Sequence, residues 1–254
     1  MMLQGKVVLV TGASRGIGRA LAVGFAADGA SVVAFARSAQ ELQETTQGDP
    51  EHLLMVVGDV TSEADVDRLV ATTYDRFGQI DVLVNNAGIG NPGALLARPF
   101  SAWADVIRVN LLGLALCTHR VLPGMITRGY GRVINLVSRA AEVPRPTLSA
   151  YGASKAGVLS FTQALATEVG PPSHPDILIN ALIPGPTDTT MTRQQGGRDP
   201  ALLQAPEAVG SDIHVMLAKR FRVTVGQSRF PREWRSTVSH GHSQGVSTMS
   251  VIPI

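Results

Sequence analysis

A tyrosine and a lysine lie four positions apart in the segment Tyr151-Gly152-Ala153-Ser154-Lys155. On a helix this spacing places both side chains on one face. Free tyrosine has a pKa of about 10 and keeps its proton at neutral pH. An adjacent ammonium favours the phenolate and brings proton transfer into the working pH range. The pair therefore predicts a general acid and base, with Tyr151 as the group that transfers the proton.

Two polar residues earlier in the chain complete a candidate catalytic set. Ser138 lies thirteen positions before Tyr151 at the end of an expected strand, where its hydroxyl would hydrogen-bond a substrate oxygen as charge develops. Asn110 lies at the head of a long expected helix, where its side chain would fix a water that passes protons to Lys155. A Tyr-x-x-x-Lys pair is also common on ordinary helix surfaces, so its weight comes from these partners.

A glycine-rich turn follows the first expected strand. Its sequence is Thr11-Gly12-Ala13-Ser14-Arg15-Gly16-Ile17-Gly18. Such a turn brings backbone N–H groups and a helix N-terminus up to a pyrophosphate. The spacing is G-x-x-x-G-x-G rather than the commoner G-x-G-x-x-G. A purely structural turn is the alternative, but the position after the first strand favours nucleotide binding.

The end of the second expected strand indicates which nucleotide is bound. NAD binding usually needs a carboxylate there, but this chain has Phe35-Ala36-Arg37-Ser38. Arg37, with Arg15 beside it, would bind a 2′-phosphate, so NADP(H) is favoured over NAD(H). The alternative is that Arg37 is a solvated surface residue. Asp59 after the third strand is expected to accept from the adenine amino group, and Val60 to pack on the adenine ring.

The elements that carry these residues alternate between strands and helices. Six short apolar runs predict buried strands: Val7–Val10, Ser31–Phe35, Leu53–Val57, Val82–Val84, Arg132–Val137 and Ile177–Ile183. Helix-period segments lie between them: Gly18–Ala27, Ala64–Phe77, Trp103–Met125 and Ala153–Val169. Repeated βαβ units predict an α/β fold, a Rossmann-type doubly wound parallel sheet in a single domain.

Composition changes toward the C-terminus. We expect a catalytic domain over residues 1–227, with residues 186–210, rich in proline and glycine, as a mobile substrate lid. Residues 228–254 form an atypical tail that we expect to be poorly ordered, and Val223–Gly226 is a candidate last strand. His240 and His242 in that tail are expected to be solvated, and no metal site is predicted.

The bulk composition excludes several classes of protein. Hydrophobic residues make up 44% and charged residues 17%, which is typical of a folded globular protein. The single cysteine, Cys117, excludes an intrachain disulfide and fits a reducing compartment. The net charge of +2 comes from the basic C-terminal region, so no nucleic-acid surface is predicted. The chain enters a strand at once and its most apolar run, Val109–Cys117, is short, so we expect a cytoplasmic protein without a membrane partner.

Taken together, these motifs resemble the short-chain dehydrogenase/reductase family, in its compact single-domain branch. The matching residues are Thr11-Gly12-x-x-x-Gly16-Ile17-Gly18, Asp59, Asn85-Asn86-Ala87-Gly88, Asn110, Ser138, Tyr151-x-x-x-Lys155, and Ile183-Pro184-Gly185 followed by Thr189. The general pattern is that of 3-oxoacyl-[acyl-carrier-protein] reductases and related ketoreductases. The resemblance implies cofactor contacts at Ser14, Arg15, Ile17, Asn86, Ala87, Gly88, Tyr151, Lys155, Pro184, Gly185 and Thr189. It also implies a homodimer or homotetramer formed through the helices that contain residues 110–125 and 151–169.

The expected activity is hydride transfer between a nicotinamide and a ketone or secondary alcohol. A different class is a non-catalytic dinucleotide-binding sensor or interaction protein, which the unusual C-terminus motivates. An epimerase or dehydratase fits poorly because the chain lacks the length for a separate sugar-binding domain. The residues near the expected substrate site are mostly apolar, among them Ile89, Gly90, Val143 and Leu148, so an uncharged small-molecule substrate is expected.

Overall fold

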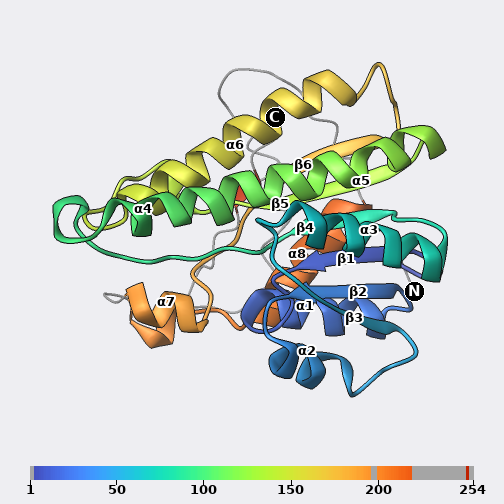
Figure 1. Cartoon of the computed structure of the whole chain (residues 1–254), viewed down its shortest axis with the longest axis horizontal. Coiled ribbons are helices and arrows are strands. Elements are labelled where there is room, and N and C mark those ends of the chain that lie inside the picture. The colour runs from blue at the N-terminus through green and yellow to red at the C-terminus, as the bar shows by residue number, and fades with distance from the viewer. Residues whose placement is uncertain (1–2, 196–198, 219–249, 252–254) are drawn as a thin grey trace, which may run out of the picture.

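A seven-stranded sheet forms the centre of the protein, which is described from a computed structural model covering residues 3–195, 199–218 and 250–251. The strand order is β3-β2-β1-β4-β5-β6-β7 (Figure 1). The first six strands are parallel and are β1 (Val7–Thr11), β2 (Ser31–Ala36), β3 (Leu53–Val57), β4 (Val82–Asn85), β5 (Gly131–Leu136) and β6 (Ile177–Ile183). The short β7 (Ser250–Val251) pairs antiparallel with β6. The six predicted strands and the Rossmann-type sheet are confirmed.

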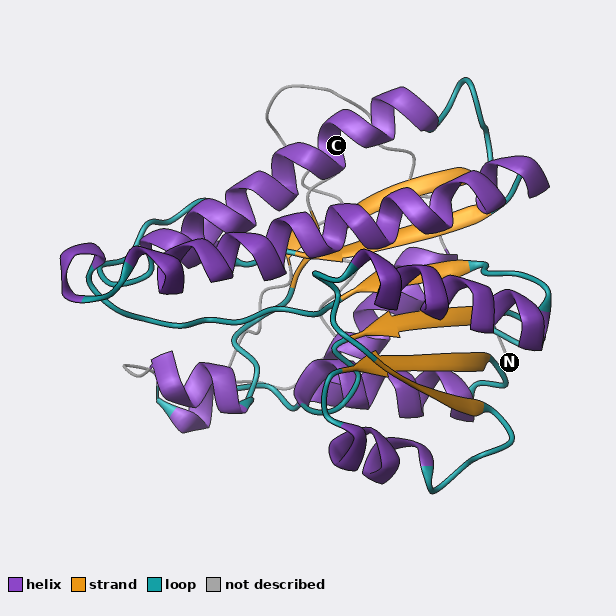
Figure 2. Ribbon diagram, in the orientation of Figure 1, coloured by secondary structure: helices purple, strands orange, loops and turns teal. Residues whose placement is uncertain are grey.

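Helices cover both faces of the sheet (Figure 2). Alternate residues of one strand enter two different cores: Val8 and Val10 pack in one, and Leu9 packs in the other. The first core lies under α1 (Gly16–Ala27), α2 (Ala39–Thr46) and α8 (Pro206–Ala218). The second lies under α3 (Glu63–Phe77), α5 (Leu114–Arg128) and α6 (Ser149–Val169). Burial on both faces explains why the strands are apolar throughout rather than alternating.

The predicted helix over residues 103–125 is longer and less regular than expected. It runs continuously through α4 (Phe100–Ile107), a π-helical segment (Arg108–Gly113) and α5. By length and composition this 29-residue helix is apolar enough to cross a membrane, with a mean hydropathy of 1.4 in its most apolar window. The shortness of the apolar run Val109–Cys117 is therefore no argument against a membrane-spanning helix. Core helices of folded proteins meet the same criterion, and Cys117, Val121 and Met125 pack against the sheet.

The sheet order reverses between β1 and β4. β1 pairs with β2 on one side and with β4 on the other, and the chain continues outward in both directions. Crossovers that leave in opposite directions open a crevice at the carboxyl ends of these two strands, which is where such folds bind ligands. The glycine turn after β1 and the Asn85-Asn86-Ala87-Gly88 segment meet at this crevice.

The segment predicted as a lid has more structure than a loop. It contains α7 (Thr190–Gln195) and a 3-10 turn (Pro200–Leu202), and α8 begins at Pro206, four residues before the predicted end of the lid. Its two ends are joined, because Gln204 N donates to Pro186 O at 2.8 Å and Asp188 N donates to Gln204 O at 2.9 Å. The segment predicted as a lid is therefore closed at its base by backbone hydrogen bonds. The candidate strand Val223–Gly226 and the histidines 240 and 242 lie outside the described residues.

Candidate active site

A cleft of about 920 Å³ opens at the carboxyl ends of β1 and β4. It is large for a small-molecule site, since such pockets measure about 300–1,000 Å³. Most of the predicted site residues line it: Gly12, Ser14, Arg15, Gly16, Ile17, Arg37, Asp59, Val60, Asn86, Ala87, Gly88, Tyr151, Lys155, Pro184 and Thr189. Four of the predicted residues do not line it: Gly18, Asn110, Ser138 and Gly185.

The glycine turn requires glycine for two different reasons. Gly12 and Gly16 have φ values of +67° and +54°, a backbone region that disfavours side chains. At Gly16 an added Cβ would also lie 3.3 Å from Cγ2 of Thr189, which brings the segment after β6 against the turn. At Gly18 an added Cβ would lie 2.1 Å from the carbonyl oxygen of Gly12. Gly18 thus lets α1 pack under the turn and does not face the cleft.

The turn is tied to the end of β4 by hydrogen bonds. Asn86 Nδ2 donates to the carbonyl oxygens of Thr11 at 2.9 Å and Gly12 at 3.1 Å. The hydroxyl oxygen of Thr11 accepts from the backbone N–H groups of Asn86 and Ala87, each at 3.1 Å. These bonds hold the two sides of the crevice at a fixed separation. The side chain of Asn86 therefore holds the glycine turn against the end of β4.

Asn85 belongs to a buried chain of polar side chains that links β4 and β5 to two helices on one face of the sheet. Its Nδ2 donates to Thr118 Oγ1 on α5 and to Asn135 Oδ1 on β5, each at 2.9 Å. Asn135 Nδ2 in turn donates to Thr162 Oγ1 on α6 at 2.9 Å. These contacts tie the centre of the sheet to α5 and α6.

One end of the cleft carries four charged side chains. Arg37 Nη1 lies 3.7 Å from Asp59 Oδ2, and Arg15 Nη1 lies 3.6 Å from Glu41 Oε1. Asp59 Oδ1 also accepts from the backbone N–H and the hydroxyl of Thr61. The carboxylate of Asp59 therefore already has partners other than the adenine amino group expected from the sequence.

Tyr151 and Lys155 lie on α6 and both line the cleft. Lys155 Nζ is 5.9 Å from the centroid of the Tyr151 ring and donates to Leu136 O at 2.6 Å. The lysine is only 5% exposed, and its burial lowers its pKa to about 8. At neutral pH its ammonium form still predominates, so a positive charge lies near the phenol.

Asn110 lies on the π-helical segment and is fully buried. Its Oδ1 accepts from Ile89 N at 2.8 Å, while its Nδ2 donates to Ile89 O and to Ser154 Oγ, each at 3.0 Å. Both hydrogens of Nδ2 are thus used within the protein. The expected contact with a water is therefore restricted to the remaining acceptor capacity of Oδ1. π-Helical turns are frequent at functional sites, and this one places Asn110 behind the cleft wall.

Ser138 follows β5 and is half-buried beside the cleft rather than in its lining. Its Oγ accepts from Ala140 N at 3.2 Å. Because the oxygen accepts this bond, the hydroxyl hydrogen is left to donate to a substrate oxygen. Of the apolar residues expected at the substrate side, Ile89 and Gly90 line the cleft and Val143 is exposed.

Sequence reasoning missed several residues of the cleft. The main ones are Ser38 and Glu41 at the start of α2, Asp188 just before α7, and Arg193 within α7. Ser38 is the N-cap of α2, since its Oγ accepts from Glu41 N at 3.3 Å. The sequence Ser38-Ala39-Gln40-Glu41 has the Ser-x-x-Glu pattern that marks a helix start. That pattern would have revealed both α2 and Glu41.

Comparisons with known proteins agree with the function that this geometry suggests. A model of the short chain dehydrogenase family matches residues 6–199, and the chain belongs to this family. It is 40% identical over 194 residues to a 3-oxoacyl-[acyl-carrier-protein] reductase of Synechocystis sp., covering 75% of this chain and 77% of that protein. It is 39% identical over 228 residues to the 2-(R)-hydroxypropyl-CoM dehydrogenase of Xanthobacter autotrophicus, covering 85% and 90%.

A solved structure of actinorhodin polyketide ketoreductase with NADPH superposes with a TM-score of 0.77 at 30% identity. The match covers 85% of this chain and 91% of that chain. The chain is therefore an oxidoreductase of this family, of the kind that acts on carbonyl or alcohol groups.

The residues present fit a dinucleotide. Two glycines with positive φ bring bare backbone to the cleft, and the first turn of α1 begins there. The cations needed for a phosphate lie at one end, and the tyrosine and lysine lie in the wall of the same cleft. The cleft thus brings together a turn of the kind that binds anions and a tyrosine, a side chain that can exchange a proton.

Proposed function

We propose that this chain uses NADP(H) to interconvert a ketone and a secondary alcohol, with Tyr151 as the general acid and base. The observation that carries the proposal is that Tyr151 and Lys155 line the same cleft as the glycine turn and Arg37. When bound, the cofactor supplies or accepts the hydride. The rest of the chemistry belongs to the residues of the chain.

The proposed cofactor contacts divide along the cleft. Backbone groups of the Gly12–Ile17 turn bind the pyrophosphate, with the N-terminus of α1 favouring negative charge. Arg37 and Arg15 hold the 2′-phosphate, and Val60 packs on the adenine. Asn86, Ala87, Gly88, Pro184 and Thr189 line the remaining walls. The likeness to reductases and to a ketoreductase with NADPH supports this choice of cofactor.

The proposed proton transfer takes place at the phenol oxygen of Tyr151. In reduction its proton passes to the substrate oxygen, and in oxidation the phenolate takes the alcohol proton. The Lys155 ammonium stabilises the phenolate, since an opposite charge nearby favours the ionised form. Ser138 donates its hydroxyl hydrogen to the substrate oxygen as negative charge develops there. Asn110 holds Ile89 and Ser154 in place and so positions the wall around Tyr151.

We further propose a homo-oligomer assembled through α4, α5 and α6. Phe100 and Leu112, on the long helix, are 71% and 58% exposed in the single chain. Large exposed apolar side chains on a helix are typical of an interface between subunits. The proposed location is the cytoplasm, and the proposed partner is a small-molecule carbonyl or alcohol. The buried thiol of Cys117, whose pKa is raised to about 12 by burial, is consistent with an unreactive packing residue.

The test is titration of the purified protein with NADPH and NADH, followed by a panel of ketones with absorbance of the reduced cofactor as the readout. Tight NADPH binding with turnover supports the proposal. Binding without turnover on any ketone or alcohol would favour the sensor alternative, which the names of the relatives do not favour. Absence of binding to either cofactor would refute the proposal altogether.

A further inference from the structure

Two arginines and two carboxylates share the end of the cleft assigned to the adenosine of the cofactor. Arg15 pairs with Glu41, and Arg37 pairs with Asp59. All four residues line the cleft. Each cation proposed to bind the 2′-phosphate thus lies beside a carboxylate, and the formal charge of the four groups is zero. A site built only to attract phosphate would leave such cations unpaired.

Both the backbone and the side chain of Glu41 are held by hydrogen bonds. Its backbone N–H is capped by Ser38, and its carbonyl oxygen accepts from Arg19 Nη2 at 3.2 Å. Its Oε2 accepts the hydroxyl hydrogen of Ser14 at 2.9 Å, and Ser14 is only 8% exposed. A glutamate at this place in a capping pattern usually reaches back to its own N-cap. Here its carboxylate crosses to the glycine turn instead and engages both polar side chains of the Ser14-Arg15 pair.

We infer that Glu41 is a specificity-determining residue, whose carboxylate limits the preference for NADP(H) over NAD(H). This inference rests on the proposed function. A 2′-phosphate carries a charge near −2, and the Arg15 proposed to hold it lies 3.6 Å from the carboxylate of Glu41, which also accepts the hydroxyl hydrogen of Ser14. The phosphate must therefore compete with this carboxylate for Arg15 and lie beside it as a like charge. A ribose 2′-hydroxyl carries no charge and meets no such repulsion.

Glu44 provides a matched control on the same helix. It lies one turn further along α2, and its Oε2 pairs with Arg19 Nη2 at 3.0 Å. It does not line the cleft. Glu44→Gln therefore removes the same charge from the same helix. Glu44 makes no direct contact with Ser14 or Arg15, and its partner Arg19 is also held by two hydrogen bonds to Ser14 O, at 2.9 and 2.6 Å.

The experiment measures dissociation constants of NADPH and NADH for the wild-type chain, Glu41→Gln and Glu44→Gln. Glutamine keeps the size of the side chain and an acceptor oxygen for Ser14. For Glu41→Gln we expect NADPH to bind about 5- to 20-fold more tightly, as removal of one partly solvated like charge would give. NADH affinity should stay within about twofold, and the gain for NADPH should shrink in about 0.5 M salt. Glu44→Gln should leave both constants within about twofold.

A second titration isolates the adenosine end, with adenosine 2′,5′-bisphosphate and adenosine 5′-monophosphate as the probes. The bisphosphate should gain affinity in Glu41→Gln and the monophosphate should not. Unchanged or weaker binding of the bisphosphate would overturn the inference, because Glu41 would then hold Ser14 and Arg15 in place for the phosphate. An equal gain in bisphosphate affinity in Glu44→Gln would also overturn the inference, since the gain would then come from the change in net charge alone.

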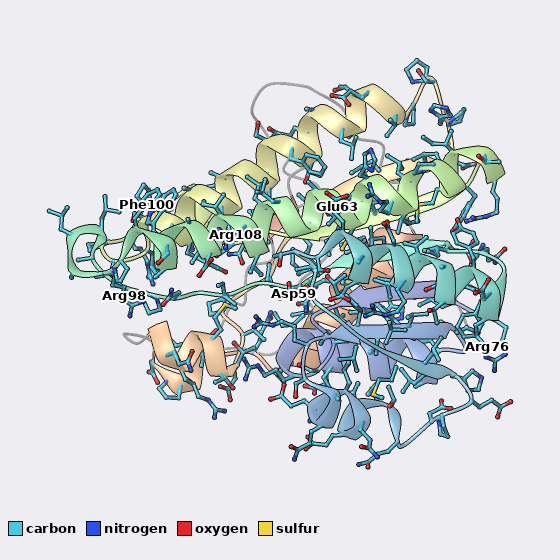
Figure 3. The ribbon with its side chains drawn as sticks, in the orientation of Figure 1. Asp59, Glu63, Arg76, Arg98, Phe100 and Arg108 are labelled. Carbon is cyan, nitrogen blue, oxygen red and sulfur yellow. The ribbon has the colours of Figure 1, made fainter. Side chains whose placement is uncertain are left out.

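Arg37→Asp separates this inference from the proposed function. It should move the ratio of specificity constants from NADPH toward NADH by about 10- to 100-fold, the loss of one charge-assisted contact. Arg76→Asp, a remote site on α3, makes the same charge change as a control (Figure 3). If Arg37→Asp has no effect, the 2′-phosphate is held elsewhere and the proposed cofactor assignment fails. If Arg37→Asp acts as expected and Glu41→Gln does not, only the inference on Glu41 fails.

Discussion

Single side chains on α6 carry the proposed chemistry. Tyr151 and Lys155 are four residues apart on one helix, so their relative position follows from helix geometry. Their relation to Ser138 does not, because that residue comes from the end of β5. The pair can therefore be located in the sequence, whereas its partners depend on the fold.

Tyr151→Phe tests the proton-transfer role. The variant removes only the phenolic oxygen and its proton, so NADPH affinity should remain within about twofold while turnover falls by about 10²- to 10⁴-fold. Steady-state kinetics and cofactor titration on the same preparation measure both quantities. Unchanged turnover would contradict the assignment of Tyr151.

Lys155→Met tests the cost of burying a charge in the cleft wall. The pKa of Lys155 is lowered from 10.5 to about 8 by burial. Between these values the unfolded chain binds more protons than the folded chain, so the contribution of Lys155 to stability rises with pH across this window and is least favourable below about pH 8. Methionine keeps the aliphatic length and removes the titration.

The measurement is urea unfolding of wild type and Lys155→Met from pH 7 to pH 10, without cofactor. The wild-type free energy of unfolding should increase relative to that of the variant by about 2–3 kcal/mol over this range. Subtracting the variant removes the titration of the other groups. A constant difference would mean that Lys155 has an ordinary pKa in the folded chain.

At the scale of whole elements, α1 packs against the glycine turn at its first residues and so affects the shape of the cleft. Gly18 lies where an added Cβ would meet Gly12 O at 2.1 Å, whereas at Gly24 an added Cβ would meet nothing within 4 Å. The two glycines lie on the same helix. They therefore form a matched pair for substitution by alanine.

Gly18→Ala should lower both the free energy of unfolding and NADPH affinity, because the turn must move away from α1 to admit the methyl group. Gly24→Ala should raise stability by about 0.5–1 kcal/mol, as expected for glycine to alanine inside a helix, and leave affinity unchanged. Chemical denaturation and cofactor titration measure the two effects. Equal effects of the two variants would rule out the packing explanation.

The helices also show the limits of pattern reading. The α6 segment was predicted from residue 153, and the helix begins at Ser149. The short α2 was missed because its sequence is polar and only Leu42, Thr45 and Thr46 are buried. The π-helical segment was not predictable, since hydrophobic periodicity does not distinguish an inserted residue from a slightly shifted helix. That segment decides where Asn110 points.

At the scale of the whole molecule, the long helix from α4 to α5 and the parallel run of α6 form one side of the protein (Figure 1). Figure 3 shows Phe100 and Arg98 at one end of this side. Leu112→Glu should convert the proposed oligomer into a monomer, because a buried unpaired carboxylate at a subunit interface is costly. Light scattering after size exclusion measures the mass.

Leu202→Glu is the control for this substitution, since Leu202 is 68% exposed but lies on the 3-10 turn within the segment predicted as a lid. It should leave the mass of the oligomer unchanged. A wild-type chain that is already monomeric would contradict the proposed assembly. Loss of assembly in both variants would show that the charge, and not the helical face, is responsible.

The sequence by itself determined the strands, the glycine turn and the Tyr151–Lys155 pair. Each of these depends on local patterns: apolar runs buried on both faces, backbone freedom at Gly12 and Gly16, and a four-residue helical spacing. The family resemblance rested on the same local motifs, and the match over residues 6–199 confirmed it. Local geometry is enough for such features because neighbours along the chain fix them.

Only the tertiary structure decided which charged groups meet across the cleft. Glu41 and Arg15 are 26 positions apart, and Arg37 and Asp59 are 22 apart, so no local pattern pairs them. Their pairing depends on how α2 packs beside the glycine turn and how β3 ends beside β2. The same holds for Asn110, whose amide the fold directs to Ile89 and Ser154. Contacts between distant segments depend on packing, and packing is a property of the whole folded chain.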